Sequence, residues 1–282
     1  MKKLLIWLPG MLSMLAACTE AVEIPARAPE KQSPVRVELH LTTEQQAATR
    51  AMDENCIRDV NLYLYGDTEY HFYFPSVSSP LVFNVLPGNY RSYAIANAGQ
   101  DLGDKNAFEI QFYETAVDVM ESSNAIPMTN RGTLAVDGAG RCTPSSLRVT
   151  RSAAKIAYTI EVADAVAPSL RLRSVQFCNL PLTIRPFDSG SISSTVEANY
   201  YDGETMPIGN ERRTAGTAYL FENLQGSVDT ITDQKDKCPE NAPACATYLR
   251  ILAERSADKA LVEYIVYPGE NNTSDFNVRR NT

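Results

Sequence analysis

Residues 35–42 read VRVELHLT, and this stretch decides the class of fold. Its apolar side chains are Val35, Val37, Leu39 and Leu41, and polar side chains alternate with them. Because successive side chains of a β-strand point to opposite faces of the sheet, this period of two predicts a half-buried strand. We expect the four apolar side chains to face a hydrophobic core.

Similar apolar stretches recur along the chain, and proline or glycine turns end several of them. The strands predicted in this way are 60–64, 70–74, 81–86, 90–96, 156–162, 170–180, 219–224, 248–253 and 261–267. The polar, Ala-rich segment 44–59 predicts a short helix or an exposed loop, and no long amphipathic helix is evident. The sequence therefore predicts an all-β protein built from β-sandwiches.

The segment 126–150 contains several turn-forming residues, and the strand pattern restarts after it. We therefore place a domain boundary near residue 140. This boundary gives an N-terminal β-sandwich over residues 34–140 and a C-terminal β-sandwich over residues 141–282.

The first 17 residues, MKKLLIWLPGMLSMLAA, have a charged start, an apolar centre and a small-residue end. This pattern is typical of a secretory signal peptide, and the apolar part is too short to span a membrane comfortably. Residues 15–18, LAAC, resemble the bacterial lipobox, which predicts lipidation of Cys18. Acyl chains on Cys18 would anchor the protein to a membrane. Residues 18–33 are rich in Pro, Ala and charge, and predict a tether.

Composition excludes several classes of function. The chain carries a net charge of -8, whereas nucleic-acid binding needs a basic face. Only His40 and His71 are available for histidine chemistry, and both read as surface or sheet residues. Phosphate-binding glycine loops, HExxH and GxSxG are absent from the sequence, and no carboxylate pair stands out. We expect no catalytic residues, no metal site and no cofactor.

Five cysteines follow Cys18, an odd number that cannot all pair within one chain. Cys238 and Cys245 bracket the short polar loop PENAPA. Since an exported protein passes through an oxidising compartment, we predict a disulfide between these two cysteines.

Several stretches together resemble the fimbrillins of Bacteroidales type V pili, namely the Mfa-like and FimA-like lipoproteins and their subgroup with a DUF4906-type C-terminal domain. Besides the lipobox, these stretches are LPGNY (86–90), IAN (95–97), IPMT (126–129), RSAAKI (151–156), YLFENLQG (219–226), YPGENN (267–272) and DFNVRRN (275–281). In order, they cover nearly the whole chain.

The resemblance implies two transthyretin-like β-sandwich domains in tandem. It also implies that the subunit reaches the outer membrane as a lipoprotein anchored through Cys18 and ends in an extracellular fimbrium that serves cell adhesion. An arginine-specific protease would cut after the first strand, and a strand from another pilus subunit would fill the groove left behind. The implied partners are therefore other subunits, the protease, the outer membrane and a receptor on a host or bacterial surface.

The exchanged strand would be the one that carries Val35, Val37, Leu39 and Leu41. The cut should fall between the first and second strands, where Arg50 is the first choice and Arg58 the second. In the family a further apolar strand follows the FNVRRNT motif, whereas this sequence ends at Thr282. Either the sequence is truncated or the second sandwich lacks its last strand.

Two other functions compete with this reading. A surface glycan-binding lipoprotein for polysaccharide uptake would need an exposed aromatic platform, for which Tyr200 and Tyr201 are the candidates. An enzyme is disfavoured by the missing motifs.

Overall fold

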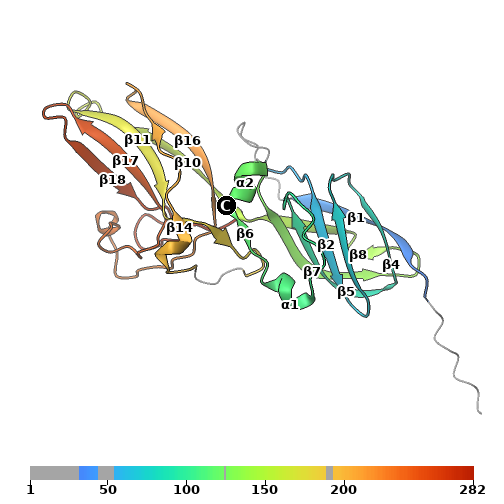
Figure 1. Cartoon of the computed structure of the whole chain (residues 1–282). Helices are drawn as coiled ribbons and strands as arrows, with labels where there is room; N and C mark the ends of the chain where they lie inside the picture. The colour runs from blue at the N-terminus through green and yellow to red at the C-terminus, as the bar shows by residue number, and fades with distance from the viewer. Residues whose placement is uncertain (1–31, 44–53, 124, 189–192) are drawn as a thin grey trace, which may run out of the picture. The chain divides into compact units, whose positions relative to one another are not determined.

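The computed structural model describes residues 32–43, 54–123, 125–188 and 193–282 (Figure 1). Its strands are β1 (Val35–Thr43), β2 (Val60–Tyr65), β3 (Glu69–Phe74), β4 (Leu81–Val85), β5 (Gly88–Ala96), β6 (Thr115–Ala116), β7 (Met128–Val136), β8 (Cys142–Thr143), β9 (Ser146–Arg151), β10 (Ala153–Glu161), β11 (Leu170–Cys178), β12 (Leu180–Pro181), β13 (Thr183–Ile184), β14 (Tyr200–Tyr201), β15 (Met206–Pro207), β16 (Arg213–Phe221), β17 (Tyr248–Arg255) and β18 (Leu261–Val266). The helices are α1 (Ala107–Gln111), α2 (Val117–Ser123) and two short 3₁₀ turns, Glu197–Asn199 and Gln234–Asp236. The prediction of a mostly β protein is confirmed.

The largest sheet has eight strands in the order β3-β2-β5-β7-β9-β1-β4, with β8 paired to β7. Its two end strands approach each other, since the rings of Phe72 on β3 and Phe83 on β4 have centroids 4.9 Å apart. The sheet is therefore nearly closed, like a barrel, around one hydrophobic core. Buried side chains from β1, β2, β4, β5, β7 and β9 all contribute to this core.

Strand β2 is buried along its whole length, because both of its faces are covered. Its inner face packs in the barrel core, and on its outer face Tyr63 and Tyr65 lie under the segment that leads into α1. The Tyr63 hydroxyl donates to the Gly103 carbonyl at 2.8 Å, and the Tyr65 hydroxyl donates to the Lys105 carbonyl at 2.6 Å. These bonds satisfy the tyrosine hydroxyls that burial would otherwise leave without partners.

Helix α1 begins with a capping box that the sequence analysis missed. The Asn106 side chain accepts bonds from the backbone N–H groups of Phe108 and Glu109, and the Glu109 carboxylate accepts from the backbone of Asn106. This reciprocal pattern satisfies backbone donors that the first turn of a helix leaves open. It explains why the irregular segment after β5 contains a helix.

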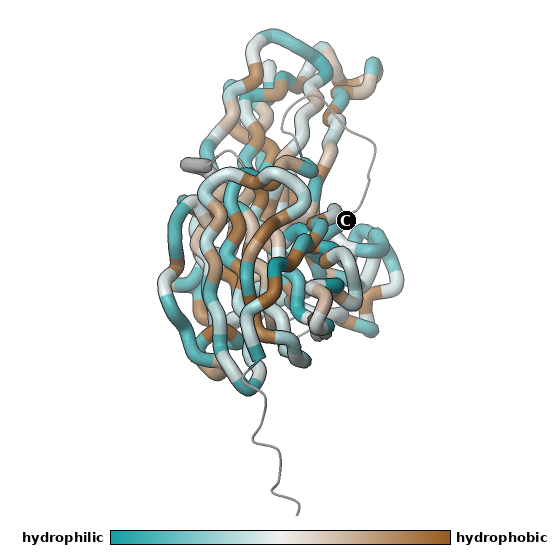
Figure 2. The backbone as a smooth tube through the Cα atoms, turned by 90° about the vertical axis from the view of Figure 1, so that its right-hand side faces the viewer, coloured by the Kyte–Doolittle hydropathy of each residue, from teal (hydrophilic) through white to brown (hydrophobic). Residues whose placement is uncertain are grey.

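The remaining strands form smaller sheets. Strands β10 and β16 pair with each other, and β15, β11, β17 and β18 form a four-stranded sheet. Two further pairs join β12 to β14 and β13 to β6. Side chains of the first two sheets share a second hydrophobic core, which contains Leu172, Phe177, Leu220 and Ile251. Figure 2 views the molecule from the side of the large sheet and shows hydrophobic and hydrophilic positions following one another along the chain.

Apart from β6, which pairs with β13, the change from the large sheet to the smaller ones falls between β9, which ends at Arg151, and β10, which begins at Ala153. The predicted boundary near residue 140 lies before this change, because β8 and β9 return to pair with β7 and β1. The turn formers around residue 140 mark the β7–β8 connection inside the large sheet. The predicted signal peptide and nearly all of the predicted tether lie outside the described residues. No helix in the described part of the chain is both long and apolar enough to cross a membrane.

Candidate functional site

Strand β1 is held by two neighbours that run in different directions. Its first half pairs antiparallel with β4, from Val35 opposite Val85 to Leu39 opposite Leu81. Its second half pairs parallel with β9, from His40 opposite Ser146 to Thr43 opposite Val149. Strand β1 therefore links β4 to β9, and its loss would leave backbone hydrogen-bonding groups unpaired on both of those strands.

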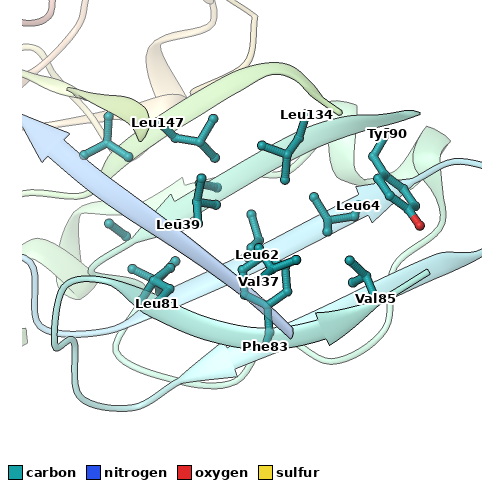
Figure 3. Packing of buried hydrophobic residues seen from close by; sticks show 14 of the residues in the cluster. Val37, Leu39, Leu62, Leu64, Leu81, Phe83, Val85, Tyr90, Leu134 and Leu147 are labelled. Carbon is teal, nitrogen blue, oxygen red and sulfur yellow. The ribbon is translucent and has the colours of Figure 1, made fainter. Parts of the chain in front are cut away.

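The inner face of β1 fills part of the barrel core. Val37 and Leu39 have no exposed surface, whereas Val35 and Leu41 are partly buried at the edge of the same core. Figure 3 shows that the side chains of Val37 and Leu39 point among residues of other strands of the sheet. These residues are Leu62, Leu81, Phe83, Val85, Leu134 and Leu147. The strand predicted from the alternating sequence is thus present, with its apolar side inward.

Strand β1 also lies against the turn between β7 and β8. Gly140 there has a φ of +79°, and a Cβ atom added to it would lie 2.1 Å from the Arg36 carbonyl oxygen. Only glycine allows the turn to approach the strand this closely. The Asp137 carboxylate organises the turn by accepting from the backbone of Ala139 and Arg141. These bonds, together with the Arg141 side chain, hold the pKa of Asp137 below its usual value.

The polar segment after β1 enters the described structure at Glu54, which is 4% exposed. The Glu54 carboxylate accepts from Lys155 Nζ at 2.6 Å and from the Tyr219 hydroxyl at 2.9 Å. Arg151 Nη1 lies 3.5 Å from the other carboxylate oxygen. A carboxylate buried this deeply is stable only because charged and hydrogen-bonding partners surround it. The sequence predicts a solvated loop charge at Glu54, but the structure buries this side chain.

The next residues are fixed by Asn97, which lies just after β5. Asn97 is fully buried and has a φ of +63°, in the left-handed region that asparagine tolerates better than most residues. Its side-chain oxygen accepts from the Arg58 backbone N–H at 2.8 Å. Its side-chain nitrogen donates to the carbonyls of Cys56 and Ile126. Asn97 belongs to the IAN motif, but the sequence did not reveal this role.

Of the predicted processing and lipidation residues, the structure describes only Arg58. Cys18 and Arg50 lie outside the described residues. Arg58 is described, and its side chain is exposed. The exchange of β1, the cut and the lipidation stay predictions.

The two cysteines predicted to pair are free thiols in this structure, where Cys245 is buried and Cys238 is half-buried. Their disulfide is not formed here and stays a prediction. His40 is exposed on β1, while the His71 ring stacks on Tyr63 with centroids 4.4 Å apart. Within the described ranges, no group of three or more His, Cys, Asp or Glu residues is arranged to hold a metal ion.

Tyr200 and Tyr201 are half-buried and do not form an exposed aromatic platform. The Tyr200 hydroxyl accepts from Gln225 Nε2 at 3.0 Å and donates to the Ser194 carbonyl, and the Asn223 side-chain oxygen lies 3.3 Å from it. Tyr201 packs against the second hydrophobic core. Both rings are therefore engaged in the fold itself.

Comparison with known proteins finds one matching family model and several solved structures with a similar fold. Residues 218–282 match the family model described as "Domain of unknown function (DUF4906)", as the resemblance predicted. This match includes YLFENLQG from Tyr219 and the whole stretch from Tyr267 to Asn281. Among curated proteins, none matches this sequence.

Three solved structures share the fold. One is a fimbrilin (FimA) from Porphyromonas gingivalis W83, 14% identical, with a TM-score of 0.57 over 88% of this chain and 87% of that one. Another is a candidate cell adhesion protein from Parabacteroides distasonis ATCC 8503, 11% identical, with a TM-score of 0.59 over 88% and 90%. The third is a candidate cell adhesion protein from Bacteroides eggerthii DSM 20697, 11% identical, with a TM-score of 0.58 over 83% and 79%. The chain therefore has the fold of a Bacteroidales fimbrilin and carries a DUF4906 domain at its C-terminal end.

Proposed function

We propose that this protein is a structural or accessory subunit of a type V pilus that serves cell adhesion. In this proposal it travels to the outer membrane as a lipoprotein anchored through Cys18 and ends in the extracellular fimbrium. Two tandem transthyretin-like sandwiches belong to the same proposal, with the large sheet continuing through β9 beyond the predicted boundary near residue 140. The shared fold with a fimbrilin supports it.

The observation that carries the proposal is the position of β1. It is the first strand in the described part of the chain, it fills the core with Val37 and Leu39, and it pairs with strands on both sides. Burial of one such side chain contributes about 1.5–3 kcal/mol. Removing β1 would thus open an apolar groove with two unpaired strand edges, which an extended strand of another subunit would fill. An arginine-specific protease that cuts after Arg50 or Arg58 would free β1 for removal.

The test is to treat the purified protein with an arginine-specific protease and to follow its mass and assembly. We expect the N-terminal part with β1 to be lost and SDS-resistant ladders to form afterwards. The double variant Arg50→Ala, Arg58→Ala should remain uncut and monomeric. If that variant still loses β1 and forms ladders, processing at these arginines is not the trigger.

A second experiment uses a synthetic peptide with the sequence of β1, residues 35–43. Added in excess during processing, this peptide should refill the groove and suppress the ladders. A matched peptide with aspartate in place of Val37 and Leu39 cannot bury its charges and should have no effect. Equal suppression by both peptides would contradict strand exchange.

A further inference from the structure

We propose that Glu54 anchors the start of the processed subunit, so that the segment from Glu54 to Asp59 stays on the folded body when β1 is lost. The processed bond then lies before Glu54, and Arg58 is not a processing site. This inference rests on the proposed function, because it assumes that β1 is removed by proteolysis. It identifies which part of the β1–β2 connection stays and the residue that holds it.

The partners of the Glu54 carboxylate come from strands that follow β1 in the chain. Arg151 ends β9, Lys155 lies on β10 and Tyr219 lies on β16. Their side-chain atoms lie 3.5, 2.6 and 2.9 Å from the Glu54 carboxylate oxygens. None of these partners lies on β1, so the contacts do not depend on the strand that is to be removed.

Losing Glu54 would leave positive charges in the protein interior without their carboxylate. The side chains of Arg151 and Lys155 are only 6% and 18% exposed. The Nη1 and Nη2 groups of Arg151 have no hydrogen-bond partner in the described structure. The Glu54 carboxylate is the nearby charge that compensates the charge of this guanidinium group. A cut after Arg58 would release Glu54 together with β1 and leave the buried Arg151 and the half-buried Lys155 without this carboxylate. A cut before Glu54 preserves the cluster.

The backbone N–H and carbonyl groups of Arg58 both form hydrogen bonds. Its N–H donates to the Asn97 side chain at 2.8 Å, and its carbonyl accepts from the Val77 N–H at 3.2 Å. The Asp59 carbonyl accepts from the Asn97 N–H at 3.0 Å, and the Asp59 carboxylate accepts from the backbone of Ala98 and Gly99. A protease binds an extended segment through free backbone groups, so these bonds must open locally before the bond after Arg58 can be cut.

The exposed side chain of Arg58 is therefore misleading as a sign of a processing site. Arg58 is an exposed residue, but the peptide bond that follows it lies between two residues held by Asn97. Glu54 adds to the protection of this bond, because it holds the chain in place on the N-terminal side of Cys56. Resistance at Arg58 thus depends on contacts that can be weakened one at a time.

The experiment is native digestion of the full chain with an arginine-specific protease, followed by intact mass measurement of the fragments. In the wild-type protein we expect the large product to begin before Glu54, with the Arg58–Asp59 bond intact. The variant Glu54→Gln removes the charge and should raise the rate of cutting after Arg58 at least about tenfold, because local opening becomes easier. Tyr219→Phe removes the hydrogen bond to Glu54 but leaves the Glu54 charge in place, so it should raise this rate less.

The matched control is Glu161→Gln, the same substitution at an exposed position at the end of β10. It should leave the rate at Arg58 unchanged. Circular dichroism of each variant confirms that it is folded, and Tyr219→Phe serves as the test if Glu54→Gln does not fold. Efficient cutting after Arg58 in the folded wild-type protein would overturn the inference, as would an unchanged rate in the folded variant under test.

Failure of the proposed function gives a different result. If the wild-type protein is cut before Glu54 and resists at Arg58 but forms no ladders, the anchor is upheld and pilus assembly is not. If ladders form from chains that begin at Asp59, the pilus function is upheld and the anchor is not.

Discussion

Single residues at turns decide how closely distant backbone segments can approach each other. Gly140 and Asn97 both have positive φ values, and each places a turn against a neighbouring segment of backbone. Gly140 approaches the Arg36 carbonyl, and Asn97 binds the backbone of Arg58. The glycines near Gly140 predict a turn there. The sequence does not reveal that Gly140 lies against Arg36 or that Asn97 binds Arg58.

Substitution of Gly140 by alanine should therefore destabilise the protein. The added Cβ atom would meet the Arg36 oxygen, and the left-handed backbone would be strained as well. We expect a loss of about 1–3 kcal/mol in the free energy of unfolding, measured by urea denaturation. Gly138→Ala is the control, because nothing lies within 4 Å of its added Cβ. Equal stability of the two variants would contradict the close approach.

The thiol of Cys178 should be unreactive in the native protein. The side chain is fully buried on β11, and burial raises the pKa of the thiol to about 11. At pH 8 roughly one thiol in a thousand would be ionised, and only the thiolate reacts. Iodoacetamide should therefore label Cys178 in urea but not under native conditions. Native labelling at the unfolded rate would contradict this environment.

The same labelling experiment tests the predicted disulfide between Cys238 and Cys245. If the bond forms in the exported protein, both cysteines stay unlabelled in urea until a reductant is added. If they are free thiols, as in this structure, urea alone exposes them to the reagent.

At the scale of elements, the first strand shows what periodicity can and cannot predict. The alternation from Val35 to Leu41 correctly gave a strand with one buried face. It could not give the partners, because β9 lies far along the chain and pairs in parallel. Likewise the turn residues near 140 suggested a boundary, whereas β8 and β9 extend the first sheet to Arg151. Pairing between distant strands decides both points.

A substitution within β1 should show that this strand stabilises the large sheet. Leu39 has no exposed surface and lies in the barrel core, so Leu39→Ala should cost about 2–5 kcal/mol of unfolding free energy. Glu38→Ala changes the exposed neighbour on the same strand and should stay within about 0.5 kcal/mol of wild type. Urea denaturation of the uncut protein measures both. A small loss for Leu39→Ala would mean that β1 contributes little to the core.

At the scale of the whole molecule, a few buried ion pairs join segments that are distant in sequence. Glu54 meets Arg151 and Lys155, and Glu222 meets Arg280. Both members of the second pair belong to stretches that carried the family resemblance. The motifs identified them, but only the fold shows that they contact each other.

Removing one partner of the Glu222–Arg280 pair should destabilise the C-terminal region. Arg280 also donates to the Pro186 carbonyl, and its side chain is only 12% exposed. Arg280→Ala leaves the Glu222 carboxylate buried without this partner, so we expect a loss of about 3–5 kcal/mol. Thermal and urea unfolding measure it.

The control for that change is Arg279→Ala, which alters a neighbouring side chain that is 41% exposed and paired with Glu270. A pair of this kind contributes about 1 kcal/mol or less. If the two variants lose the same stability, burial does not set the strength of the Glu222–Arg280 pair.

The sequence by itself determined the mostly β fold, the inward face of the first strand and the resemblance to fimbrillins. These features are local, because period-two alternation, turn residues and short motifs act within a few neighbouring residues. Only the tertiary structure decided that β1 bridges β4 and β9, that Gly140 packs on Arg36 and that Glu54 is held by Arg151, Lys155 and Tyr219. Those contacts join residues far apart in the chain, and their energies come from burial and backbone pairing that exist only once the strands have assembled.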